Sequence, residues 1–96
     1  MLTTGEVVVT ATIVSIMNTN LSFYDFVHSA LQRHQSLDFG DLDAHDLKAN
    51  QEALKHGSRV FSAYLLPVCL DCGYSKVYII TEADRSCTTV LFPHEY

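Results

Sequence analysis

Apolar and polar residues alternate in the C-terminal half of the chain in a way that predicts three consecutive strands. In the first of them, every second residue from Val60 falls on one side, and the residues between, which include Phe61, fall on the other. β-branched and aromatic residues dominate the other two, and turn residues such as Pro67 separate the segments. The predicted strands are residues 59–66, 76–81 and 87–92. Three strands joined by short loops form an antiparallel meander.

Near the N-terminus, residues 5–10 have the valine and threonine content of a further strand. Residues 11–16 are still rich in β-branched side chains, so the pattern alone allows the strand to continue through Ile13 and Val14. We prefer the alternative, a strand over residues 5–10 followed by a short helix, for which Thr10 would be the N-cap. Either alternative ends at the polar residues 18–20.

A helix that starts at Ser22 is the clearest element in the sequence. Ser22 and Asp25 resemble a capping box, with Asp in place of the usual Glu or Gln. Five apolar residues then recur at helical spacing and share one stripe: Phe23, Phe26, Val27, Ala30 and Leu31. We expect this stripe to form a major part of the core, and residues 32–35 to lead out to solvent.

A second helix is predicted from Ala44 to Lys55, with Asp43 as its N-cap and Gly57 as the left-handed residue that ends it. Its apolar face is narrow and includes Asn50, which we expect to bind neighbouring main chain. Two helices ahead of a meander predict a small α+β fold, one domain over residues 1–96. We expect an antiparallel sheet of three to four strands, with two to three helices packed on one face.

The composition is that of a folded domain, because 48% of the 96 residues are hydrophobic and only 18% are charged. The net charge is −5. The basic residues are scattered, so we expect no direct binding to nucleic acid: Arg33, Lys48, Lys55, Arg59, Lys76 and Arg85. The apolar stretch 7–17 is shorter than the roughly 20 residues that cross a bilayer, and no basic residue precedes it. We therefore expect a cytoplasmic protein without membrane association.

Four aspartates lie in the segment that leads into the second helix: Asp38, Asp41, Asp43 and Asp46. They could hold a cation or dock against a basic partner, but their spacing differs from that of a calcium-binding loop. In the structural alternative, Asp41 shapes a turn, Asp43 caps the helix and Asp46 lies in its first turn. We keep Asp38, Asp41 and Asp43 as candidate partner-binding residues.

Glu82, Asp84 and Arg85 lie at the predicted tip of the last hairpin. The two carboxylates and the guanidinium could act as acid, base and anion clamp. Alternatively, Asp84 accepts main-chain N–H bonds in the turn and Arg85 pairs with a nearby acid. Because exposed polar tips on rigid hairpins are common recognition points, we expect these three residues to contact a partner.

The three cysteines, Cys69, Cys72 and Cys87, are an odd number in a chain without a secretion signal, which favours free thiols. Cys69 and Cys72 have the spacing of a metal chelate, but a closed zinc site needs four ligands, so Cys87 and a histidine would have to join them. A redox role lacks its usual setting, because the two residues lie between strands. We expect a plain hairpin loop without metal or cofactor, with a site of all three thiols as the alternative.

The sequence contains no phosphate loop, dinucleotide fingerprint or Gly-x-Ser-x-Gly motif, and its five histidines lack the spacing of a helical metal pair. A nucleophile and a histidine base can still be brought together by the fold. We nevertheless expect a protein that is not an enzyme.

The C-terminal third of the chain resembles the ending of a group of small bacterial proteins of unassigned function, through residues 80–86, 88–91, 93 and 95–96. The resemblance lies mainly beyond Phe39 and continues through residues 40–42, 46, 49–50, 53–54, 57–59 and 62–64. Proteins of that group recur on plasmids, phages and integrative elements. The resemblance implies a mobile-element setting and a short helix after Thr10. It also implies a shorter turn without cysteines in place of residues 69–72, and it supplies no catalytic residues.

Charge, size and resemblance together lead to one functional hypothesis with two alternatives. We expect a small acidic protein of a mobile genetic element that binds another protein and inhibits a host defence complex, of the anti-CRISPR or anti-restriction type. The first alternative is a metal- or thiol-dependent regulator built on Cys69, Cys72 and Cys87. The second is a homodimer or interaction module that pairs through an exposed strand edge.

Overall fold

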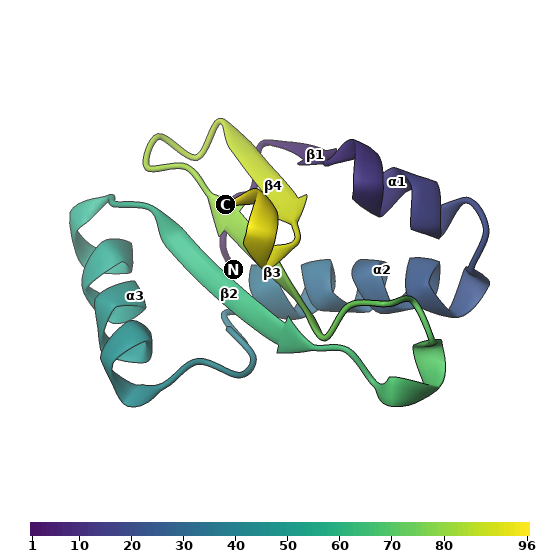
Figure 1. Ribbon diagram of the computed structural model, residues 1–96. Coiled ribbons are helices and arrows are strands. Elements are labelled where there is room, and N and C mark those ends of the chain that lie inside the picture. The colour runs from purple at the N-terminus through teal and green to yellow at the C-terminus, as the bar shows by residue number, and fades with distance from the viewer.

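The computed structural model describes residues 1–96 and has an α+β fold built on a four-stranded sheet in the order β1-β4-β3-β2 (Figure 1). The strands are β1 (Glu6–Val9), β2 (Val60–Leu65), β3 (Lys76–Thr81) and β4 (Cys87–Leu91). The helices are α1 (Ala11–Met17), α2 (Leu21–Gln35) and α3 (Ala44–His56), and two 3-10 turns complete the fold, η1 (Val68–Leu70) and η2 (Pro93–Glu95).

The sheet is mixed, which corrects the expectation of a purely antiparallel sheet. Strands β2, β3 and β4 form the predicted antiparallel meander. Strand β1 instead pairs with β4 in parallel, with Val7 opposite Thr88 and Val9 opposite Val90. No hairpin joins these two strands: three helices and two strands lie between them in the chain, and such a long crossover is the usual connection of parallel neighbours.

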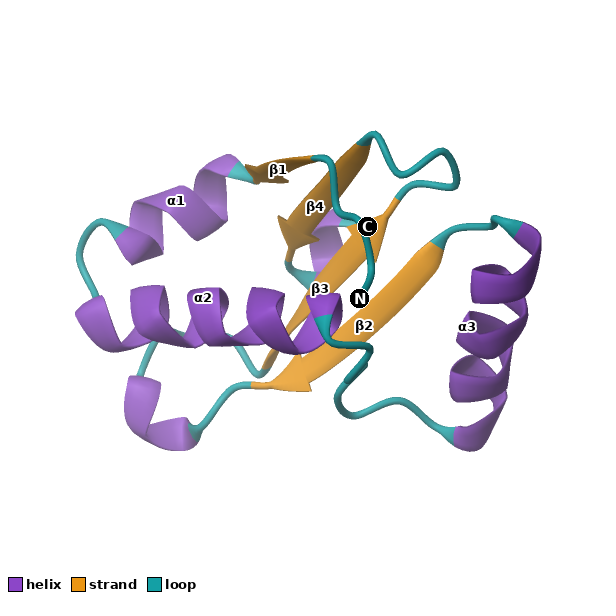
Figure 2. Ribbon diagram, turned by 180° about the vertical axis from the view of Figure 1, so that it is seen from behind, coloured by secondary structure: helices purple, strands orange, loops and turns teal.

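Helix α2 crosses one face of the sheet and α1 packs beside it (Figure 2). The α2 stripe supplies Phe23, Val27 and Ala30 to the core, where they meet sheet residues such as Ile79 and Val90. Phe26 and Leu31, the other two members of the predicted stripe, are partly buried against the same core. None of the helices has the length and apolar character needed to span a membrane.

The N-cap of α1 is the residue expected from the sequence, whereas the N-cap of α2 is not. The Thr10 side chain accepts the N–H of Ile13 at the start of α1, which confirms the short helix. The N-cap of α2 is Asn20, which accepts the N–H of Phe23 at 3.0 Å, rather than the predicted Ser22. Asn20 also donates to the Leu70 carbonyl at 2.8 Å, a long-range contact that no local pattern contains.

Helix α3 lies along the outer edge of β2 instead of on a face of the sheet, as both views show (Figures 1 and 2). Its predicted caps are confirmed: Asp43 accepts the N–H of Asp46 at 2.8 Å, and Gly57 ends the helix at φ +70°. Asn50 is buried and binds both the N–H and the C=O of Phe61, so it takes the place of a neighbouring strand. The expected two to three helices on one face are therefore α1 and α2, whereas the second predicted helix, α3, covers an edge.

No helix covers the face of the sheet opposite α2. Only the last turn of the chain, η2, folds over it, in front of the strands in Figure 1 and behind them in Figure 2. Strand positions that alternate with the core residues point to this face, and they include Phe61, Tyr78 and Leu91. This open face carries the candidate site.

Candidate functional site

Three aromatic side chains gather on the open face. Phe61 on β2 and Tyr78 on β3 are diagonal neighbours, and their rings meet edge to face with centroids 4.7 Å apart and planes at 72°. Tyr96, which follows η2, meets Tyr78 in the same way at 6.2 Å and 85°. Tyr96 is 68% exposed. Such contacts are typical of aromatic clusters, and here one side of the cluster faces solvent.

The surface around these rings is hollowed in two adjoining places, which we call the sheet groove. The larger hollow has a volume of about 580 Å³ and is lined by Asp46, Phe61, Tyr78, Pro93 and Tyr96. The smaller one, of about 210 Å³, is lined by Arg59, Ile80, Glu82, Thr89, Leu91, Glu95 and Tyr96. Tyr96 lines both hollows.

Hydrogen bonds fix the turn that carries Tyr96. The Glu95 carboxylate accepts the N–H of Phe92 at 2.8 Å and the hydroxyl of Thr10 at 2.9 Å. The bond from the Phe92 main chain is the main reason why the pKa of Glu95 lies below its ordinary value. The Tyr96 hydroxyl accepts from the Arg59 guanidinium at 3.2 Å. Side-chain hydrogen bonds therefore anchor η2 and the following Tyr96 against the rest of the fold.

The charges that line the sheet groove are predominantly negative. Asp46, Glu82 and Glu95 contribute three carboxylates, whereas Arg59 contributes the one guanidinium, which pairs with Glu82 at 3.3 Å. Carboxylates beside exposed aromatic rings form a surface that attracts organic cations, because the ring faces carry negative potential. The arrangement can therefore bind lysine or arginine side chains.

Two of the predicted partner-binding aspartates are occupied by contacts within the chain. Asp38 forms an ion pair with Arg33 at 2.7 Å and accepts the N–H of Gly40 at 3.2 Å. The pKa of Asp38 is lowered chiefly by the bond from Arg33. Asp41 accepts the N–H of Leu65 at 2.9 Å, at the end of β2. With the cap formed by Asp43, the loop aspartates have structural roles.

The hairpin tip also has structural contacts, and they differ from those expected. Asp84 accepts the N–H and the hydroxyl of Ser86 at 3.0 and 2.6 Å. These bonds, the one from the hydroxyl first, lower the pKa of Asp84. Arg85 pairs with no acid: it donates to the carbonyls of Ser58, Glu82 and Ala53 at 2.6, 3.0 and 3.4 Å. Its guanidinium thus joins the hairpin tip to the segment that ends α3, where the Ala53 carbonyl also accepts the N–H groups of Gly57 and Ser58.

The two predicted groups of site residues lie at opposite ends of α3 and do not form one surface. Asp43 caps the first turn of this helix, whereas Arg85 binds the Ala53 carbonyl near its end. A helix of 13 residues separates them, about 20 Å. Of the six predicted residues, Glu82 alone lines the sheet groove.

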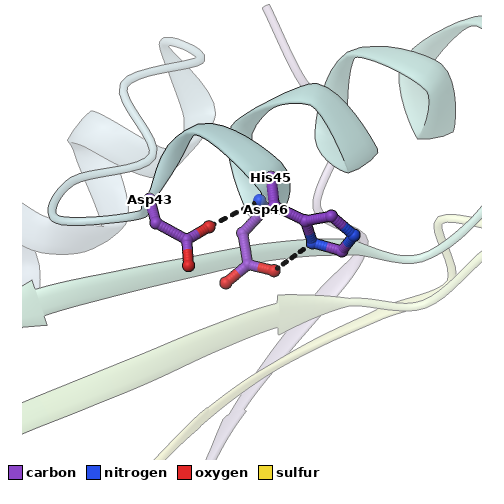
Figure 3. Close-up of side chains that lie close together, drawn as sticks. All are labelled: Asp43, His45 and Asp46. Atoms are coloured by element: carbon purple, nitrogen blue, oxygen red, sulfur yellow. Dashed lines mark hydrogen bonds and ion pairs between the residues drawn. The ribbon is translucent and has the colours of Figure 1, made fainter.

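Asp43, His45 and Asp46 bring three possible metal-binding atoms within 4.8 Å of one another at the start of α3 (Figure 3). Asp43 is committed to the N–H of Asp46, and His45 contacts the Asp46 carboxylate at 3.4 Å. The group lies at the positive end of the helix dipole, which disfavours a cation. Its geometry is explained by helix capping.

The three cysteines are free thiols, and the fold keeps them from acting together. Cys69 and Cys72 lie in the loop before β3, whereas Cys87 begins β4 beside the far end of β3. The length of β3 separates the two places, about 17 to 20 Å. A metal site of all three thiols is therefore excluded in this fold.

One buried series of hydrogen-bonded polar side chains was not predicted, because His34 was expected in solvent. His34 is fully buried, and its ring contacts Ser62 through Nδ1 and Thr81 through Nε2, the latter at 2.8 Å. Thr81 contacts the hydroxyl of Thr88 at 2.7 Å, which in turn donates to the Thr4 carbonyl at 2.7 Å.

The Thr4 carbonyl at the end of this hydrogen-bonded series determines which group donates in each of its bonds. The Thr88 hydroxyl donates to the carbonyl, so it accepts from Thr81, and Thr81 accepts from His34 Nε2–H. His34 Nδ1 is then the acceptor for the Ser62 hydroxyl. Burial keeps the ring neutral by lowering the pKa of His34 to about 4. Ser62 and His34 have the pairing of a nucleophile and a base, but both are fully buried, so no substrate reaches them in this conformation.

The sequence did contain signals for the residues that were missed. His34 lies four residues beyond Ala30 and continues the buried stripe of α2. Strand β2 carries apolar residues on both sides, but the predicted helices can cover only one face of the sheet. The apolar residues on the other side of β2, such as Phe61, therefore indicated an uncovered apolar face.

A comparison of the chain with protein-family models, curated proteins and solved structures found no match.

Proposed function

We propose that the protein binds another protein through the sheet groove, and that lysine or arginine side chains of the partner enter it. The observation that carries this proposal is an aromatic cluster, left open on the helix-free face, with three carboxylates and a single guanidinium around it. A cationic side chain placed over a tyrosine ring and beside a carboxylate gains both interactions at once.

The kind of partner that fits this surface is a protein with a basic nucleic-acid channel. Such channels present several arginine and lysine side chains, and an acidic protein of net charge −5 is drawn to them over long distance. The resemblance of residues 80–96 to mobile-element proteins supports a host defence complex, CRISPR or restriction, as the target. The protein would act by occupying the channel, without catalysis.

The proposal is tested first with a defined probe. An arginine-rich peptide is titrated into the labelled protein, and amide shifts are followed by NMR, with a glutamate-rich peptide as the control. We expect shifts at Phe61, Tyr78 and Tyr96 that saturate with the arginine peptide and fade as salt is raised. Shifts confined to other surfaces, or equal shifts with both peptides, would overturn the groove as the binding site.

The second test identifies the partner and uses matched variants. The protein is used as bait in a host lysate, and each captured protein is measured against Tyr78→Ser and Asp46→Asn. The controls are Tyr24→Ser, an exposed tyrosine on α2, and Glu52→Gln, an exposed acid on α3. We expect the groove variants to lose capture of a nucleic-acid enzyme, the control variants to retain it, and the wild type to inhibit DNA cleavage by that enzyme. Equal capture by all variants would refute the proposal.

A further inference from the structure

The two edge strands of the sheet, β2 and β1, differ in whether other parts of the chain bind their outward main-chain groups. At the β2 edge, the Ala63 N–H donates to the Phe39 carbonyl at 3.3 Å, and the Ala63 carbonyl accepts the Asp41 N–H at 2.7 Å. The Leu65 N–H donates to the Asp41 carboxylate, and Asn50 binds both groups of Phe61. The outward main-chain groups of Phe61 and Ala63 and the N–H of Leu65 thus have partners within the chain, which hinders further strand pairing.

The β1 edge has no such cover. The N–H groups of Glu6 and Thr10 donate to Ser86 and Val90, so the alternation of a strand turns the main-chain groups of Val7 and Val9 away from β4. Strand β1 is the last in the sheet and pairs with β4 alone. The residues Val7 and Val8 are 41% and 37% exposed. An open edge with exposed valines is a template for one more strand.

The sequence of β1 is complementary to itself in one antiparallel register. Pairing through the outward groups of Val7 and Val9 sets Val7 of one copy opposite Val9 of the other, and Val8 opposite Val8. The same register places Glu6 opposite Thr10, so no two carboxylates face each other. A second copy of the chain therefore satisfies the edge without a charge clash.

We propose that two copies of the protein pair through β1 about a twofold axis and join their sheets into one continuous sheet. This pairing keeps each face of the sheet on its own side, so both sheet grooves open on one surface and the helices α1 and α2 lie on the other. The dimer presents two identical binding surfaces to one partner, which raises avidity. The proposal is independent of what the groove binds.

The dimer is weak because the strand is short. Four residues on an edge bury far less than the roughly 800 Å² per partner that stable interfaces bury. The wild-type protein is therefore expected to be monomeric at low micromolar concentration and to dimerise as it approaches the millimolar range.

Sedimentation equilibrium over this range, with matched variants, tests the proposal. Val8→Lys places two ammonium groups opposite each other and should abolish the dimer, as should Val8→Glu with two carboxylates. Equimolar mixing of the two variants should restore it. Leu65→Lys, an exposed apolar residue at the covered edge, is the control and should dimerise like the wild type.

Amide exchange gives a second measurement, because the dimer alone makes the exchange rate of the β1 amides depend on protein concentration. Exchange of the Val7 and Val9 N–H groups should slow with protein concentration, whereas other exposed amides should not change. A wild type that stays monomeric near the millimolar range overturns the proposal, and so does a dimer that Val8→Lys leaves intact. If the Val8→Lys monomer still binds the arginine-rich peptide, a failure of the dimer proposal leaves the proposed binding at the sheet groove intact.

Discussion

Asn50 takes the place of a strand beside Phe61: its side-chain oxygen accepts the Phe61 N–H at 3.0 Å, and its amide group donates to the Phe61 carbonyl. This pair of bonds joins α3 to the edge of the sheet. We predict that Asn50→Ala lowers the free energy of unfolding by about 2 kcal/mol, because both main-chain groups lose their partner. Denaturant unfolding measures the change.

The neighbouring Gln51→Ala is the control for this prediction. Gln51 is exposed on the same helix, so its replacement should change the free energy of unfolding by less than about 0.5 kcal/mol. If the two variants were equally stable, the bonds to Phe61 would not support the fold.

His34 makes the stability of the protein depend on pH. Its pKa is about 4 in the folded protein and about 6.5 in an unfolded chain, so the unfolded chain takes up a proton first as the pH falls. The free energy of unfolding should therefore be highest above pH 6.5 and decline between pH 6.5 and 4. The loss from this one residue is about 3 kcal/mol when complete.

Urea unfolding at a series of pH values measures this slope. His34→Gln removes the titrating ring, so its stability should change less between pH 6.5 and 4 than that of the wild type. His45→Gln replaces an exposed histidine and should keep the wild-type slope. The same slope in the wild type and in His34→Gln would exclude His34 as the origin.

Gly40 is required by space as well as by conformation. It has φ +74°, and a Cβ atom there would overlap the Ala63 carbonyl and lie 2.6 Å from the Tyr64 ring. Gly57 has a similar φ of +70° with open space around it. Gly57→Ala should therefore cost about 1 to 2 kcal/mol, the strain of a left-handed residue. Gly40→Ala should cost clearly more, and equal midpoints in thermal unfolding would contradict the packing argument.

Arg85 combines a strained backbone with a favourable side chain. It has φ +62°, and its guanidinium binds the carbonyls of Ser58, Glu82 and Ala53. Arg85→Ala should lower the free energy of unfolding by about 2 kcal/mol, because bonds to a charged group are lost. Arg85→Gly loses the same bonds but removes the strain, so it should be about 1 kcal/mol more stable than Arg85→Ala. The reverse order would show that the backbone of Arg85 is unstrained.

Features set by neighbouring residues could be predicted from the sequence. The caps at Asp43 and Gly57 depend on a few residues around each of them, and both are confirmed. The short helix after Thr10 is different, because the local pattern left strand and helix open and only the resemblance implied the helix. The three meander strands lie within a residue of their expected ends, because period-two alternation is a local pattern. Asn50 was recognised for a similar reason, since an amide on a narrow apolar helix face needs a partner.

Features set by distant residues could not be predicted. The parallel place of β1 depends on β4, more than 75 residues away, and no turn between them fixes the direction. The sheet groove needs Asp46, Phe61, Tyr78 and Tyr96 together, and these come from a helix, two strands and the last turn. Arg85 was expected to pair with an acid, but in the fold it donates to the carbonyls of Ser58, Glu82 and Ala53.

The pairing of β1 with β4 has a consequence for how the protein folds. Strand β1 is the first element of the chain, and its one partner strand begins at Cys87. During synthesis, residues 6–9 stay unpaired until residues 87–91 have been made, although the β2–β3 hairpin can form earlier from nearby residues. Closure of the sheet is therefore expected to be a late and slow step, during which the valines of β1 are most exposed to aggregation.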